Sequence, residues 1–237
     1  MIAKLIAAIA CAILLVGLGA TGILKLKSGN RGSQNNDYVK WREKNSLKEK
    51  ARQTKAEGKT SITLPGVWLD YPVSDVKLDT AFQDYSVVVA EVVTSKSYPV
   101  NLDGVTTWYK FRLLDQLSQK FATYCHTCPV PEVPEEMSFI NVDEFLLPTA
   151  GGTINIDDVE VTVDRGSEPV FESGKKYLLI LSLTGSRVAS LPARSAGIFR
   201  VHENEQLEAL DKASPIQAEL NRRFGGDLSK LRIHSKR

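Results

Sequence analysis

The sequence predicts a mainly β protein: a small closed β-barrel with flanking helices, preceded by one N-terminal transmembrane helix. Three observations lead to this prediction. A valine-rich segment at residues 85–94 has no polar face, further strand patterns follow it, and the chain begins with a long uncharged run. The 237 residues are 43% hydrophobic, which is enough for one well-formed core.

The uncharged run is long enough to span a bilayer. It begins at Leu5, ends at Leu24 and contains twenty residues, with lysines on both flanks. A cleaved secretory signal is the alternative, because small residues near Ala20 suit a signal peptidase. We favour the uncleaved anchor, since this run is longer than the apolar region typical of a signal. The lipid bilayer is therefore a predicted partner of residues 1–27.

Residues 28–60 are predicted to form a basic polar linker that is partly helical. Residues 28–33 are flexible and polar, and residues 38–57 are charged and helix-capable with few apolar side chains to bury. Residues 25–60 carry eleven Lys or Arg against four acids, whereas residues 61–237 carry eighteen against twenty-four. The linker is interpreted either as a segment attracted to anionic lipid head groups or as a solvated spacer.

The predicted barrel, residues 61–203, is organised around the segment at 85–94. Five of its ten residues are valine, so we expect a strand that is buried on both sides. In the next segment Tyr109, Phe111 and Leu113 alternate with polar residues, which is the pattern of a half-buried strand. The predicted closing strands lie at 107–117, 138–147, 153–164 and 176–183, with shorter strands at 63–69 and 197–201.

A hairpin is predicted within residues 153–164. Apolar residues alternate with polar ones on both sides of Asp157 and Asp158, as pairing across a two-residue connection demands. The acidic side chains of this hairpin offer oxygen ligands for calcium, but two of them alternate with valines and are interpreted as the solvent face of a strand. The four acids are Asp157, Asp158, Glu160 and Asp164.

Helices are predicted on both sides of the barrel. Residues 77–83 carry apolar side chains at helical spacing, and two further helices are predicted at 205–211 and 215–224. Ser214 is a suitable N-cap for the last of these, and Gly225 ends it. Its apolar stripe is expected to pack on the barrel, with a partner's groove as the alternative; the stripe consists of Ile216, Leu220 and Phe224. Residues 204–237 are thus predicted to be C-terminal helices and a basic tail.

The order of these segments resembles the OB-fold barrel of the netrin module and the tissue inhibitors of metalloproteinases. The resemblance is carried by VVVAEVV, YKFRLL, GGTINIDDVEVTV, PVFESGKKYLLIL and GIFRV, and it covers about residues 78–203. It implies an OB-like barrel in a bacterial branch of secreted or anchored proteins whose activity is unknown. The inhibitors chelate a protease zinc through an N-terminal Cys-x-Cys motif. Residues 61–70 contain no cysteine, so inhibition is not implied for this chain.

Cys125 and Cys128 form the one constellation in the sequence that could carry chemistry. Two thiols at this spacing can close a disulfide, exchange disulfides or provide half of a zinc site. A zinc site would need two more ligands from only three histidines. The prolines that follow Cys128 cannot supply the helix that lowers a thiol pKa in oxidoreductases. We therefore predict a structural disulfide, with a thiol-disulfide oxidoreductase as the alternative.

The sequence contains evidence for each side of the membrane as the location of the domain. Six Lys or Arg follow the apolar run within twenty residues, which favours the cytoplasm by the positive-inside rule. The signal-like start of the chain and the resemblance to secreted or anchored proteins favour the other side. We adopt the extracytoplasmic location as the prediction, and a cytoplasm-facing membrane-bound adaptor remains the alternative.

The predicted function is that of a membrane-anchored binding or interaction module that is not an enzyme. No catalytic, cofactor-binding or metal-binding residue is proposed from the sequence, and a protein partner is a possibility that the sequence leaves open. Nucleic acid is not expected as a ligand, because the folded part is acidic. The aromatic side chains that could stack on bases are Tyr98, Trp108 and Tyr109.

The thiols provide the first test. In an exported domain Cys125 and Cys128 should be oxidised in the purified protein. Replacing both with serine should leave the domain folded and cost at most about 2–3 kcal/mol, because the closed loop is short. Thiol titration against pH beside a reductase assay measures this. A thiol pKa well below about 8.5 together with disulfide turnover would instead identify an oxidoreductase.

Overall fold

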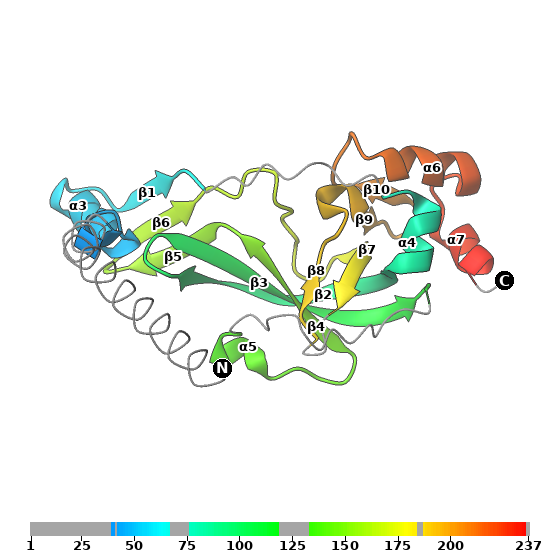
Figure 1. The fold of residues 1–237 in the computed structure, drawn as a ribbon, viewed down its shortest axis with the longest axis horizontal. Coiled ribbons are helices and arrows are strands. Elements are labelled where there is room, and N and C mark those ends of the chain that lie inside the picture. Colours follow the sequence, from blue (N-terminus) through cyan, green and yellow to red (C-terminus); the bar gives the residue numbers. More distant parts are fainter. Residues whose placement is uncertain (1–38, 41, 67–75, 119–132, 184–186, 236–237) are drawn as a thin grey trace, which may run out of the picture.

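The structure is a computed structural model that describes residues 39–40, 42–66, 76–118, 133–183 and 187–235 (Figure 1). The described residues form a mixed α/β structure with more strand than helix, so the prediction of a mainly β protein with flanking helices is confirmed only in part. Cys125, Cys128 and the apolar run from Leu5 to Leu24 lie outside the described residues. In the described part of the chain, no helix has the length and apolar character needed to cross a bilayer.

The strands form two sheets (Figure 1). The larger sheet has the order β10-β9-β7-β2-β3-β4, with β8 paired to β7, and the smaller has the order β1-β6-β5. The larger sheet contains β2 (Ser86–Val100), β3 (Gly104–Gln116), β4 (Glu144–Ala150), β7 (Lys176–Leu183), β8 (Ala189–Ser190), β9 (Ile198–Val201) and β10 (Leu207–Ala209). The smaller contains β1 (Ser61–Leu64), β5 (Gly152–Ile156) and β6 (Val159–Val163).

The first half of β2 is buried on both faces, as the valine-rich sequence predicts. Residues 86–90 are all buried, and the strand pairs with β7 on one edge and with β3 on the other. Val87 and Val89 belong to the cluster formed with the helices, whereas Val88 and Ala90 belong to the aromatic cluster on the opposite face. β2 is therefore the centre of the larger sheet.

The prediction of a closed barrel is wrong, because the sheets do not close. β4 and the segment that leads into β8 are joined by an isolated parallel bridge of Leu146 with Val188 and not by a ladder, and Leu146 N donates a hydrogen bond of 3.0 Å to Arg187 O. β8 is only two residues long and cannot extend this bridge into a ladder. The hairpin at residues 152–163, which was expected to help close the barrel, instead pairs with β1 in the smaller sheet.

That hairpin itself forms as predicted. β5 and β6 pair from Gly152 with Val163 to Ile156 with Val159. Asp157 and Asp158 connect them with φ values of 50° and 68°, the two positive values that a type I′ turn requires. The valines of β6 are buried, and the acidic side chains of the hairpin lie on its solvent side.

The helices cover both ends of the molecule (Figure 1). Pro215–Phe224 forms α6 with the predicted ends, since Ser214 Oγ accepts a hydrogen bond from Gln217 N and Gly225 has a φ of 65°. Its apolar stripe is buried against the sheet. The helices are α3 (Leu47–Ala56), α4 (Leu78–Asp84), α5 (Glu135–Ser138), the 3-10 helix η1 (Arg194–Gly197), α6 and α7 (Leu228–Ser235).

Two segments differ in type from their prediction. Residues 205–211 were expected to be helical, but β10 forms there because the turn after β9 reverses the chain and pairs Leu207–Ala209 with β9. Pairing along the sheet edge outweighs the helical preference of this short segment. Residues 138–147 were expected to form a strand, but α5 ends at Ser138 and β4 begins only at Glu144.

α3 is part of the folded unit, although it lies within the predicted linker of residues 28–60. Leu47 and Ala51 are 3% and 0% exposed and pack in a cluster with Val105 and the valines of β6. The Leu47 amide also donates a 2.7 Å hydrogen bond to Leu102 O at the tip of the β2–β3 hairpin. The part of the predicted linker that precedes residue 39 lies outside the described residues.

The packing of α3 can be tested with a buried charge. Ala51→Asp should lower the free energy of unfolding by about 2–5 kcal/mol, because it places an unpaired carboxylate among buried valines. Gln53→Asp is the matched control on the exposed side of the same helix, with an expected loss below about 1 kcal/mol. Urea denaturation of the full chain in non-ionic detergent measures both. Equal stability of the two variants would mean that α3 behaves as a linker.

Candidate ligand-binding site

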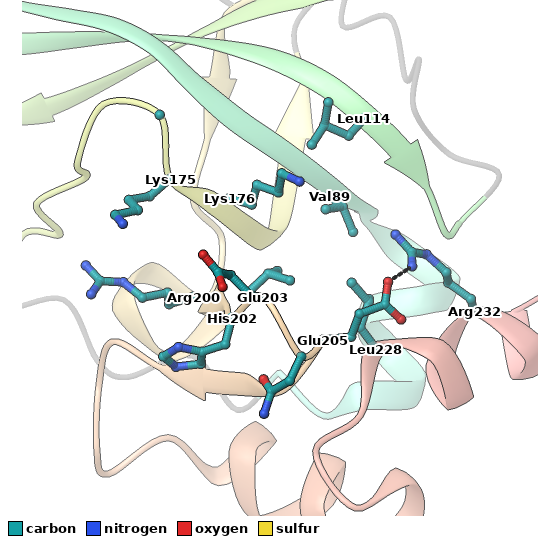
Figure 2. A pocket seen from close by; sticks show the side chains of 13 residues that line it. Val89, Leu114, Lys175, Lys176, Arg200, His202, Glu203, Glu205, Leu228 and Arg232 are labelled. Carbon is teal, nitrogen blue, oxygen red and sulfur yellow. Dashed lines mark hydrogen bonds and ion pairs between the residues drawn. The ribbon is translucent and has the colours of Figure 1, made fainter.

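A hollow of about 760 Å³ lies between the start of β7, strand β9, the turn that follows β9, and α7 (Figure 2). Its walls are charged and its floor is aliphatic. The charged and polar lining residues are Lys175, Lys176, Arg200, His202, Glu203, Asn204, Glu205 and Arg232, and the remaining ones are Val89, Leu114, Gly174, Val201 and Leu228.

Backbone pairing fixes the position of the cationic side chains. Lys176 is the first residue of β7 and pairs with Glu91 of β2 and Val201 of β9. Arg200 lies one step back along β9, opposite Tyr177. The register places Lys176 on the same face as Val201 and Arg200 on the same face as Tyr177, so the two cations leave opposite faces of the β7–β9 pair and both reach the hollow at its end.

The turn after β9 forms a second wall and is closed by its own hydrogen bonds. His202 N donates to Gln206 O at 2.9 Å, and Glu205 N donates to His202 O at 2.9 Å. Glu205 has a φ of 61°, and its carbonyl accepts a hydrogen bond from Leu228 N, the first residue of α7. This wall is therefore tied both to the sheet and to the C-terminal helix.

The two arginines of the pocket are neutralised by neighbouring carboxylates. Arg232 Nε donates to Asp115 at 2.7 Å, and its Nη1 donates to Glu205, the contact dashed in Figure 2. Burial lowers the pKa of Arg232, but the hydrogen bonds to both carboxylates outweigh it and leave the pKa above its ordinary value. Arg200 forms an ion pair with Glu172, and hydrogen bonds to Tyr177 and Glu172 raise its pKa.

Lys175 and Lys176 differ from the arginines, because no carboxylate of the described residues forms an ion pair with either. Both side chains are exposed at the rim of the hollow. Figure 2 shows Lys175 and Arg200 on one side and Arg232 on the other. In the same view the Lys175 side chain points toward the side of Arg200 and the Lys176 side chain points the other way, toward Val89 and Leu114, so an anionic group at this rim would meet the two lysines from different sides. The aliphatic floor would receive the apolar part of the same ligand.

His202 is the one titratable lining residue that suggests acid–base chemistry. Its Nε2 lies 2.9 Å from a carboxylate oxygen of Glu208, and both side chains are on the surface. The pocket lining contains no serine, threonine, cysteine or tyrosine that this histidine could activate.

The sequence-predicted candidates lie elsewhere. Cys125 and Cys128, the predicted disulfide, are outside the described residues, so that prediction remains untested. Among the described residues, no group of three or more His, Cys, Asp or Glu side chains is placed to hold a metal ion. In the acidic hairpin Asp158 forms an ion pair of 3.1 Å with Lys55, and Asp164 accepts a hydrogen bond from Gly166 N.

The three aromatic residues considered for base stacking do not share one surface. Tyr98 and Trp108 line a second hollow of about 670 Å³ beside the β2–β3 hairpin, together with prolines and valines. Tyr109 lies on the opposite face of β3, where it is 1% exposed and its hydroxyl accepts a 2.6 Å hydrogen bond from Arg165. The alternation of side chains along a strand separates Tyr109 from the other two.

Comparison with models of known protein families, with curated proteins and with solved structures gives no match. The resemblance to the netrin module therefore remains a prediction from the sequence. The pocket was not predicted from the sequence, because its lysines, its arginines and the turn after β9 carry no pattern that links them. Only the pairing of β7 with β9 and the position of α7 bring them together.

Proposed function

We propose that the protein is a membrane-anchored, extracytoplasmic binding module without enzymatic activity, and that the pocket between β7, β9 and α7 binds an anionic group of its ligand. The observation that carries the proposal is that Lys175 and Lys176, at the rim of the hollow, form no ion pair with any residue that the structure describes. The predicted anchor from Leu5 to Leu24 supports the membrane location.

A small organic anion suits this pocket better than a nucleic acid. The hollow of about 760 Å³ lies within the range of about 300–1,000 Å³ that is usual for small-molecule sites. Residues 61–237 carry eighteen Lys or Arg against twenty-four acids, so a long polyanion is repelled by the domain as a whole. The local positive charge can therefore select a ligand short enough to stay within the pocket.

The OB-like architecture is also part of the proposal. It is supported by the linear order of pairing in which β4 pairs with β3, β3 with β2, β2 with β7 and β7 with β8. The bridge of Leu146 with Val188 brings β8 against β4 in parallel orientation. A five-stranded, partly open Greek-key barrel is the general description of the OB-fold, so an OB-like architecture does not require the closed barrel that the structure excludes.

The anion site can be tested with citrate as the probe. Calorimetric titration of the full chain in non-ionic detergent at low ionic strength should show binding. Changing Lys175 and Lys176 together to glutamine should weaken it roughly 30-fold, since two lost contacts of about 1 kcal/mol each correspond to that factor. Lys212→Gln with Lys230→Gln removes the same charge outside the pocket and should change the affinity little.

The charge-matched control separates local contacts from the overall field. Equal weakening by both double variants would attribute citrate binding to net charge and remove the pocket from the proposal. Absence of citrate binding to the parent chain would contradict the anion site directly. Inorganic phosphate is titrated in parallel to show whether the pocket prefers carboxylates to a compact anion.

A further inference from the structure

The loop between α5 and β4 displays two large apolar side chains. Phe139 is 76% exposed and Val142 is 85% exposed, the two highest values among the large hydrophobic side chains of the described residues. Single exposed hydrophobic residues are ordinary on protein surfaces. Phe139 and Val142, however, lie within four residues of each other, so together they form one exposed apolar surface.

The loop is held in this conformation by side chains from its surroundings. Lys110 Nζ donates a 2.6 Å hydrogen bond to Phe139 O, and Arg187 donates one of 2.6 Å to Asn141 O. The Asn141 amide donates a 2.9 Å hydrogen bond to the carboxylate of Glu144. Burial opposes ionisation of Glu144, but the hydrogen bonds from Asn141 outweigh it and lower its pKa. The apolar side chains are thus presented by a fixed loop.

Not every apolar side chain of this loop points to solvent. Ile140, between them, packs against a small core cluster that contains Trp108, Met137 and Leu146. The loop therefore places one apolar side chain inward and the two others outward. An outward-facing pair on a fixed support loses little conformational entropy when it meets a partner.

The two cations that hold the loop also flank its apolar tip. Lys110 and Arg187 bind the loop carbonyls, and the Arg187 side chain reaches the surface. An apolar tip with basic neighbours is the arrangement of segments that enter the lipid interface, where the cations meet phosphates. Asp143 follows the tip and is exposed, so apolar insertion rather than net charge must supply the attraction.

We propose that Phe139 and Val142 insert into the interface of the bilayer that holds the N-terminal anchor. This inference rests on the anchor of the proposed function. Between Leu24 and residue 39 the extended chain spans at most about 50 Å, so the domain stays close to the lipid surface. Such tethering raises the effective concentration of the surface and allows a contact of two side chains to form.

A bilayer fits this feature better than a folded protein partner. Stable protein interfaces bury at least about 1,000 Å² with matched shape, far more than two side chains provide. A lipid surface needs no such complementarity, because the acyl boundary adapts to the side chains that enter it. The loop then fixes which face of the domain meets the membrane.

The test places a tryptophan at the tip in the full chain, reconstituted in phosphatidylcholine and phosphatidylglycerol vesicles. Phe139→Trp should emit at shorter wavelength than the same side chain in water, and brominated lipids should remove most of the added emission. The parent chain supplies the background of its native tryptophans. Ile233→Trp is the control at another exposed apolar position, 60% exposed on α7, and its added emission should stay unquenched.

Two other results would contradict insertion, and a separate measurement tests the anchor. Unquenched emission from Phe139→Trp, or equal quenching of Phe139→Trp and Ile233→Trp, overturns insertion by this loop. A blue shift that depends on protein concentration and not on lipid overturns it in favour of contact between two copies. Alkaline washing of the same vesicles tests the anchor separately: release of the chain contradicts the anchor, while the quenching recorded before the wash still decides the loop.

Discussion

The double-sided burial of the first half of β2 is the constraint on which the rest of the larger sheet depends. Its backbone is paired along both edges, and its side chains alternate between two cores, so neither the helices nor the aromatic cluster can form without it. Val87 and Val89 support the face covered by α4, α6 and α7, and Val88 supports the face where Phe111 and Phe145 stack with ring centroids 5.3 Å apart. A charge on either face would cost several kcal/mol against a total stability of about 5–15 kcal/mol.

The second half of the same hairpin connects the two sheets. Register shifts after Val89 and Val92 bend β2, and the long hairpin then reaches the small sheet and α3 (Figure 1). At the crossing, Thr107 Oγ1 donates to Gly151 O and accepts from Arg165, each at 2.8 Å. A Cβ atom on Gly152 would stand 2.3 Å from that oxygen, so only glycine allows β5 to leave the main sheet here. The glycine pair and the polar contacts behind it therefore determine that β5 and β6 join a separate sheet.

Elements whose signals are local were predictable, and features that depend on distant pairing were not. β7 follows from a continuous apolar run, the β5–β6 hairpin from alternation across a two-residue turn, and α6 from its caps, and all of these signals act within about ten residues. Whether β4 and β8 form a ladder depends on the distance between these two strands in the folded protein. β10 forms because the outer edge of β9 is available for pairing. The apolar content of α3 is low, so its own sequence does not predict that Leu47 and Ala51 are buried. Their burial depends on contacts with Val105 and the valines of β6, which are distant in the sequence. The pocket combines residues of β7, β9 and α7 and has no local signature at all.

The distribution of ion pairs separates cations that hold the fold from those that remain available to a ligand. Arg223 joins α6 to α4 through Asp79 at 2.6 Å and also contacts Glu219, and Arg232 joins α7 to β3 through Asp115. A planar guanidinium can hold two carboxylates at once, which suits such junctions. The lysines at the pocket rim make no such contact with described residues, and a hydrated ammonium group at the surface costs little to leave unpaired. Because the side chains of these lysines form no ion pair within the described residues, replacing them should cost little stability, whereas replacing Arg200 or Arg232 removes ion pairs that hold the fold together.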